Sequence, residues 1–304
     1  MNQTLLSNKL HFTVFLAYLR LTRPANVITA MADVTAGYSI AATLASGGMP
    51  FFPPVWLLLA TACLYAGGVV FNDVFDYKID LKERPERPIP SGKVPLLNAG
   101  ILGAALLLLG VVFALMVNIW CGVLALCIAL FALLYDGWGK HYALIGPINM
   151  GMCRSLNLML GVVVVPAVVA EIYYIALIPL VYIFSVTLVS REEVKGGNYT
   201  ALYAALALFC SVIIFLGWLS VQYGTLSFSW IFLALLALFV LGPLVKAIAK
   251  PSPGNVQQAV KFGVISLIIL NACLASVYSG WEISLAILSL LPLSFLISKL
   301  FAVT

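Results

Sequence analysis

The chain has few charged side chains for its length. Only 9% of its 304 residues are Asp, Glu, Lys or Arg, whereas 63% are hydrophobic. A soluble domain carries about 25% charged residues, so this composition excludes a water-soluble globular protein. Apolar runs of about 20 residues, the length a helix needs to cross a bilayer, recur along the chain. The sequence therefore predicts an all-α protein, a polytopic membrane helical bundle.

Histidine and paired cysteine are also scarce. The chain has 2 His and 6 Cys, and every cysteine falls inside an apolar run without a C-x-x-C pair. Structural zinc and disulfides require clustered or paired ligands, so the sequence argues against both. The net charge of +5 is best explained by membrane topology and anionic headgroups, and no nucleic-acid motif is present.

The apolar runs predict nine core transmembrane helices and a tenth at the C-terminus. They lie at about 24–46, 55–76, 95–117, 119–136, 143–168, 172–190, 201–222, 229–249, 258–278 and 282–302. Residues 1–22 precede them as a cytoplasmic or interfacial segment with an amphipathic helix over 5–22. Residues 78–94 are expected to be a polar loop. We assign all of 1–304 to a single transmembrane domain.

The basic residues predict the orientation in the membrane. Apart from Arg154, all Lys and Arg side chains fall at one side of the predicted bundle, whereas the opposite loops carry only Glu171 and Glu282. Because basic loops stay in the cytoplasm, we expect the N-terminus and the basic face to be cytoplasmic. A bacterial inner membrane is the expected location.

One stretch, residues 71–94, departs from the apolar pattern. Asp73, Asp76 and Asp80 are spaced i, i+3, i+7, and Asn72 lies four residues before Asp76. On a helix these spacings place the side chains on one face, where the carboxylates repel one another. Mg²⁺, which binds carboxylates and substrate phosphates, would relieve that repulsion. The stretch predicts a magnesium-diphosphate site, and the competing interpretation is a solvated helix end.

The same residues resemble a known family. Residues 72–80 match N-D-x-x-D-x-x-x-D, the first aspartate-rich motif of UbiA-type intramembrane prenyltransferases, and residues 84–92 are similar to the R-P-x-R-P-(I/L)-P-S-G segment that follows it. The resemblance covers about residues 15–278. Weaker matches are the first-helix signature Arg23-Pro24-x-Asn26 and a Tyr…Lys element formed by Tyr135 and Lys140. The resemblance implies transfer of an isoprenyl group from its diphosphate to an aromatic or other lipophilic acceptor inside the membrane, with Mg²⁺ as cofactor.

The resemblance also implies roles for individual residues. The candidate catalytic residues are Asp73, Asp76, Asp80, Lys140 and Arg154. The candidate substrate-binding residues are Asn26, Asn72, Arg84, Arg87, Tyr135, Asn149, Arg191, Glu192 and Lys195. The candidate metal ligands are Asn72, Asp73, Asp76, Asp80, Glu192 and Glu193.

The second aspartate-rich motif of the family is incomplete here. The corresponding residues 190–198 read Ser-Arg-Glu-Glu-Val-Lys-Gly-Gly-Asn, with Gly196 at one expected aspartate and Tyr199 near the other. Glu192 and Glu193 are the remaining carboxylates. Together with residues 150–161, this segment resembles the EboC-like branch of the superfamily, whose members occur in operons tied to secondary metabolism.

Two questions stay open at this stage. Arg154 in the fifth span costs roughly 2.5–3.5 kcal/mol to insert, and it either contacts a diphosphate or headgroup or pairs with Asp33. Three functions fit the protein as a whole. The first is a prenyltransferase, the second is a non-catalytic or transport-linked binder of an isoprenoid or secondary metabolite, and the last is a conventional transporter or channel. The gathering of polar residues on one side argues against the last, which would place them at the midplane.

Overall fold

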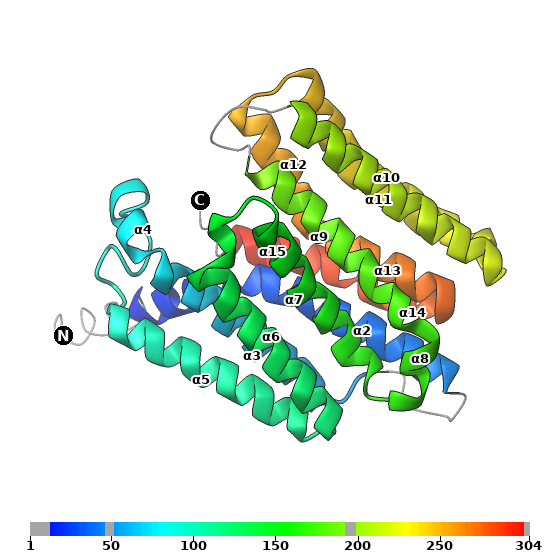
Figure 1. Cartoon of the computed structure of the whole chain (residues 1–304), viewed down its shortest axis with the longest axis horizontal. Helices are drawn as coiled ribbons and strands as arrows, with labels where there is room; N and C mark the ends of the chain where they lie inside the picture. Colours follow the sequence, from blue (N-terminus) through cyan, green and yellow to red (C-terminus); the bar gives the residue numbers. More distant parts are fainter. Residues whose placement is uncertain (1–12, 46–51, 192–198, 301–304) are drawn as a thin grey trace, which may run out of the picture.

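The computed structural model describes residues 13–45, 52–191 and 199–300, and every regular element in this part of the chain is a helix. Figure 1 shows these helices packed as an elongated bundle, with α4 at one end and the pair α10 and α11 along one edge. The all-α prediction is confirmed. All six cysteines are free, as the sequence predicted.

The longer helices form the bundle and the short ones connect them. The longer helices are α2 (Pro24–Leu44), α3 (Val55–Phe75), α5 (Leu96–Leu115), α6 (Ile119–Gly137), α7 (Ile145–Val162), α9 (Leu177–Ser190), α10 (Tyr199–Gln222), α11 (Leu226–Ala249), α12 (Pro253–Ile265), α13 (Leu267–Tyr278), α14 (Trp281–Leu288) and α15 (Leu290–Leu300). The short ones are α4 (Tyr77–Glu83), η1 (Gly139–His141), η2 (Pro166–Val168), α8 (Val169–Ile172) and η3 (Tyr173–Ala176). A helix over residues 13–21 precedes α2, and the remainder of the predicted segment 1–22 lies outside the described residues.

In the described part of the chain, nine helical stretches are long and apolar enough to cross a bilayer. They correspond to nine of the ten predicted spans, with α12–α13 and α14–α15 each counted as one stretch. The remaining predicted span, the fifth, corresponds to α7, an 18-residue helix that carries Arg154 and two asparagines. Helix α7 packs between α2, α6 and α9, so its polar side chains are buried inside the bundle.

The prediction of a polar loop over residues 78–94 was wrong for the first part of that segment. Helix α3 ends at Phe75, Asp76 has a ψ of 0°, and a second short helix, α4, then runs from Tyr77 to Glu83. This segment contains neither Gly nor Pro, so nothing in it opposes a helix. Helix α4 stops at Arg84, which has an extended φ of −145° because Pro85 follows it.

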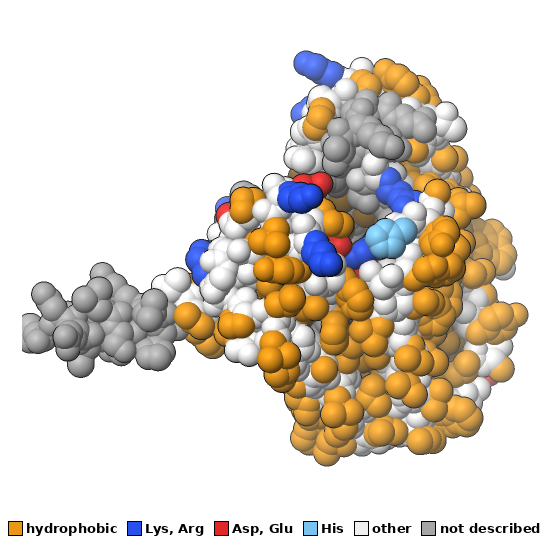
Figure 2. Space-filling view, turned by 60° about the vertical axis from the view of Figure 1, so that its left-hand side comes forward, with side chains coloured by type: hydrophobic (Ala, Val, Ile, Leu, Met, Phe, Trp, Pro, Cys, Tyr) orange, Lys and Arg blue, Asp and Glu red, His pale blue; other side chains and the backbone are white. Residues whose placement is uncertain are grey.

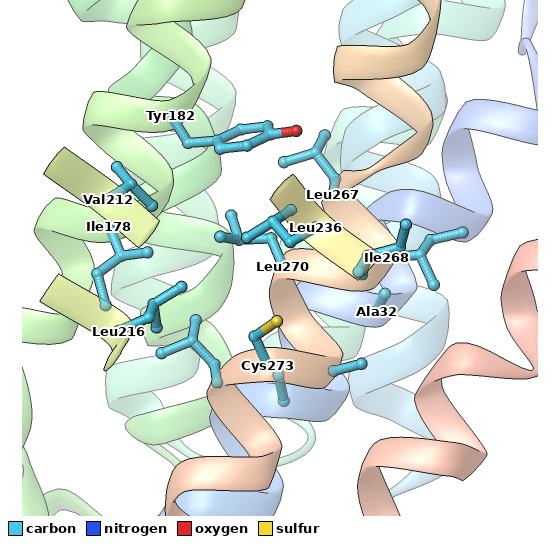
Figure 3. Packing of buried hydrophobic residues seen from close by; sticks show 14 of the residues in the cluster. Ala32, Ile178, Tyr182, Val212, Leu216, Leu236, Leu267, Ile268, Leu270 and Cys273 are labelled. Carbon is cyan, nitrogen blue, oxygen red and sulfur yellow. The ribbon is translucent and has the colours of Figure 1, made fainter. Parts of the chain in front are cut away.

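Helix α13 lies at the centre of the larger hydrophobic cluster, and each of its 12 residues is buried. Figure 3 shows Leu270 and Cys273 of α13 among side chains from α2, α9, α10 and α11. A second cluster joins α2, α3, α5, α6 and α7. Helices α2 and α7 take part in both clusters, so they hold the two halves of the bundle together.

Glycines bring α2 and α7 into backbone contact. A Cβ on Gly161 would lie 2.3 Å from the carbonyl oxygen of Val34, and one on Gly37 would lie 2.0 Å from that of Leu158. Small residues allow such close approach between membrane helices. This contact holds α2 and α7 in an orientation in which their polar side chains face each other.

Candidate active site

A cavity of about 550 Å³ lies between α2, α3, α6 and α7. Its walls are largely apolar, with Leu64, Val69, Ile128, Ala132 and Met150 among the lining residues. Its mouth is polar and is formed by Arg23, Asn72, Asp76, Arg84, Arg87, Tyr135, Asp136, Lys140 and Ser190. Figure 2 shows Lys and Arg side chains, with acidic ones between them, gathered around a hollow at this end of the molecule.

Two of the predicted carboxylates meet at one arginine. Nη1 of Arg87 lies 2.7 Å from Oδ2 of Asp80 and 3.4 Å from Oδ1 of Asp73. Nη2 of Arg23 lies 2.7 Å from the same oxygen of Asp73. Asp73 and Asp80 are 6% and 2% exposed, and the partly exposed guanidinium groups of Arg23 and Arg87 relieve the repulsion between them. The predicted proximity of these acids holds even though α3 and α4 are separate helices.

The third predicted carboxylate pairs with a lysine from the other side of the cavity. Nζ of Lys140, on η1, lies 2.6 Å from Oδ1 of Asp76. Arg84 is farther from its acidic neighbour, with 3.9 Å between Nη1 and Oδ1 of Asp80, and half of its side chain is exposed. Acidic and basic groups therefore alternate at the mouth. They come from the α3–α4 region on one side and from η1 on the other.

Arg191, a predicted substrate-binding residue, is not among the residues that line the cavity. Its guanidinium donates to the backbone carbonyls of Lys140 at 3.0 Å, Tyr142 at 3.0 Å and Ala143 at 2.5 Å. The helix α9 ends at Ser190, so Arg191 follows directly and reaches across to the chain after η1. It therefore positions the segment that carries Lys140.

Deeper in the cavity, Arg154 pairs with Asp33, which was one of the two interpretations of this residue. Nη1 of Arg154 lies 2.6 Å from Oδ2 of Asp33, and Nη2 donates to Oγ1 of Thr29 at 2.7 Å. Amide groups of Asn157 and Asn271 donate to the two Asp33 oxygens at 3.1 Å and 2.6 Å. Arg154 also lines the cavity, so its candidate catalytic role stays a prediction beside this structural one.

The remaining predicted residues fall into two groups. Among the described residues, neither Asn26 nor Asn149 lines the cavity: Asn26 is half-buried on the first turn of α2, and Asn149 is buried with its amide against the backbone of Phe131 and Tyr135. These two substrate-binding predictions therefore lack support from the geometry. The predictions that concern the second motif, Glu192, Glu193 and Lys195, lie outside the described residues.

Sequence reasoning missed two residues at the mouth, Arg23 and Asp136. Arg23 belongs to the Arg-Pro-x-Asn signature but is not among the predicted site residues. Asp136 follows Tyr135 near the end of an apolar run, is 3% exposed, and accepts a hydrogen bond from Nδ2 of Asn72 at 2.7 Å. An acid inside a membrane span is itself a functional signal, and that signal would have identified Asp136.

The sequence profile of the UbiA prenyltransferase family matches residues 34–268. This chain belongs to that family. The match begins within α2, one residue after Asp33, and it includes every residue of the cavity rim apart from Arg23. The resemblance seen in the motifs is therefore confirmed for the superfamily, and the EboC-like branch stays a prediction.

Related proteins agree with the UbiA assignment. The digeranylgeranylglyceryl phosphate synthase of Sulfurisphaera tokodaii is 34% identical over 184 residues, which are 59% of this chain and 63% of that protein. A solved structure of a digeranylgeranylglyceryl phosphate synthase is similar with a TM-score of 0.64 and 25% identity, over 89% of this chain and 99% of that one. The fold also matches an Archaeoglobus fulgidus UbiA homologue bound to GPP and Mg²⁺, with a TM-score of 0.59 and 17% identity over 88% and 99% of the two chains.

The residues at the mouth of this UbiA protein fit a magnesium ion that arrives with a substrate. Among the described residues, no three His, Cys, Asp or Glu side chains are arranged to hold a metal by themselves. Magnesium commonly takes one or two carboxylates and completes its coordination with substrate phosphates and water. Oxygen donors of this kind are present in Asn72, Asp73, Asp76 and Asp80, next to bases suited to phosphate.

Proposed function

We propose that this protein is a Mg²⁺-dependent prenyltransferase that moves an isoprenyl group from a prenyl diphosphate to a lipophilic acceptor inside the membrane. The observation that carries the proposal is a cavity with apolar wall residues whose polar mouth includes Asp76, Arg87 and Lys140. Arg87 links this mouth to Asp73 and Asp80, which lie behind it. Membership of the UbiA family supports it. The apolar walls suit an isoprenyl chain, and the mouth suits its diphosphate.

In the proposed reaction, the bond between C1 of the prenyl chain and the diphosphate oxygen breaks, C1 bonds to the acceptor, and the acceptor releases a proton. Bound magnesium supplies charge neutralisation at the leaving diphosphate. Arg23, Arg87 and Lys140 neutralise the acids in this structure, and they become available to phosphate oxygens when a metal binds the carboxylates. The cavity walls keep water away from C1.

We infer that the mouth faces the cytoplasm. Four basic residues make their contacts at this end of the bundle: Arg23, Arg87, Lys140 and Arg191. At the opposite end, Asn118 bonds the backbone at the apolar end of α7. Positive charge marks the cytoplasmic side of membrane proteins. The matching relatives are archaeal, so a bacterial inner membrane has no support from them.

The second candidate function is a non-catalytic or transport-linked binder of an isoprenoid or secondary metabolite. It is favoured by Gly196 and Tyr199, which stand where the second aspartate-rich motif would have acids. Tyr199 begins α10 and is exposed. This candidate retains the cavity and the binding of a ligand but lacks turnover. Assignment to the EboC-like branch stays a prediction.

The test uses the full chain in lipid nanodiscs with radiolabelled prenyl diphosphates and a membrane lipid extract as the source of acceptor. Geranylgeranyl diphosphate belongs in the set because the matched relatives are named as digeranylgeranylglyceryl phosphate synthases. We expect Mg²⁺-dependent release of pyrophosphate that is abolished by Asp73→Ala and by Asp76→Ala. Glu171→Ala, at an exposed site on the far side of the bundle, is the matched control.

Two results would decide against the proposal. Undiminished transfer by both aspartate variants would exclude the acidic stretch as the catalytic site. Tight ligand binding by the wild type, without pyrophosphate release from any prenyl diphosphate, would favour the non-catalytic binder.

A further inference from the structure

Asp136 differs from the other four aspartates of the chain. Each of those four has an Arg or Lys nitrogen within 4.0 Å; they are Asp33, Asp73, Asp76 and Asp80. Asp136 is 3% exposed and has no such partner in the described part of the chain. Its side chain accepts one hydrogen bond there, from the neutral amide of Asn72.

A buried carboxylate without a cation is unfavourable, because one hydrogen bond from a neutral group does not replace its hydration. Asp136 lines the cavity, so a cation inside the cavity can supply the missing compensation. The feature therefore indicates a positively charged ligand at this point of the rim, on the α6 side.

The hydrogen bond between Asn72 and Asp136 also orients the amide. An ionised carboxylate only accepts hydrogen bonds, so the NH₂ group of Asn72 faces Asp136 and the amide oxygen remains for another partner. Among the described residues, no group donates a hydrogen bond to that oxygen or to Oδ2 of Asp136. Asp76 lies one helical turn after Asn72, since its backbone N–H donates to the Asn72 carbonyl at 3.0 Å.

We propose that Asp136 is a ligand of the magnesium ion that accompanies the diphosphate, together with the amide oxygen of Asn72 and the carboxylate of Asp76. All three side chains line the same cavity and come from the facing ends of α3 and α6. Two carboxylates and a neutral oxygen, completed by phosphate, match the preference of magnesium. The inference rests on the proposed function, because the ion is expected to bind with a prenyl diphosphate.

This assignment explains how the site works with an incomplete second motif. Gly196 and the region of Tyr199 cannot supply the carboxylates that are expected there. Asp136 provides a further carboxylate at the cavity, from α6. Nζ of Lys140, now 2.6 Å from Asp76, is then available to the diphosphate.

The experiment measures Mn²⁺ binding to the full chain in nanodiscs by electron paramagnetic resonance, with and without inorganic pyrophosphate. Asp136→Asn removes the charge and keeps an oxygen that accepts from Asn72. We expect it to weaken pyrophosphate-dependent Mn²⁺ binding by about 10- to 100-fold or more, the range known for groups that support a metal. Asp76→Asn is the positive control, and Glu171→Gln, exposed and remote, should bind like the wild type.

The outcomes separate this inference from the proposed function. Mn²⁺ binding within twofold of wild type in Asp136→Asn, together with weakened binding in Asp76→Asn, overturns the role of Asp136 and leaves the proposed function standing. Unchanged binding in both variants overturns both. A wild-type structure with Mn²⁺ and pyrophosphate decides the question without any variant: an Asp136 oxygen at about 2 Å from the metal supports the inference, and a metal that no Asp136 oxygen contacts overturns it.

Discussion

Replacement of Arg154 by methionine should destabilise the protein strongly, because it leaves Asp33 as a buried charge without a cation. Asp33 is 0% exposed and Arg154 is 6% exposed, with 2.6 Å between Nη1 and Oδ2. Removal of one partner of a buried ion pair costs about 3–5 kcal/mol. The amides of Asn157 and Asn271 still donate to Asp33 in the variant, so the lower half of that range is expected.

The free energy of unfolding can be measured by denaturant titration of the protein in mixed micelles. The double variant Asp33→Leu/Arg154→Met should lose less stability than Arg154→Met, since neither charge remains and the groups that lose a partner, on Thr29, Asn157 and Asn271, are neutral. Lys246→Met is the control, because Lys246 is an exposed base on α11 and its loss should change stability by no more than about 0.5 kcal/mol. A loss below about 1 kcal/mol in Arg154→Met would refute the reasoning, since it would mean that water in the cavity solvates Asp33.

Two further predictions concern packing and positioning. Gly161→Ala should destabilise the protein by about 1–3 kcal/mol in the same titration, because its Cβ would lie 2.3 Å from a backbone oxygen of α2. The control is Gly242→Ala, which should be neutral or slightly stabilising because no atom lies within 4 Å of its Cβ. Equal losses of stability in the two variants would contradict the contact between α2 and α7. Arg191→Met should raise KM for the prenyl diphosphate by roughly tenfold, about 1.4 kcal/mol, because the segment that carries Lys140 loses three hydrogen bonds; an unchanged KM would show that this segment is held by other contacts.

Much of the architecture could be predicted because the membrane imposes it locally. Each apolar run must satisfy its own backbone hydrogen bonds in lipid, so its length and composition are enough to predict a helix. The approach of Asp73 to Asp80 was predicted from helical spacing and is present. The helical part of the segment 78–94, by contrast, was predicted to be a loop because its composition is polar. The absence of Gly and Pro before Pro85 was the better indicator, since it permits a helix there.

The substrate-binding predictions for Arg191 and Asn149 gained no support from the structure, for a different reason. Both residue types bind phosphate or polar ligands in many proteins, and no local pattern reveals that their side chains instead bond backbone groups across the bundle. The same limit applies to Arg154, for which the sequence left an ion pair and a ligand contact equally open. The pair with Asp33 joins residues 121 positions apart, and the sequence named this partner without deciding between it and a ligand.

The sequence by itself determined that the chain is a bundle of membrane helices, that its charges gather at one end, and that a stretch of acids at that end suits a metal and a diphosphate. These properties follow from composition and from spacings within single helices, so they need no knowledge of packing. The tertiary structure decided which groups face one another: Arg23 and Arg87 on Asp73, Lys140 on Asp76, and Asp136 on Asn72. Those contacts depend on how α2, α3 and α6 pack side by side, and close packing brings together residues that the sequence keeps far apart.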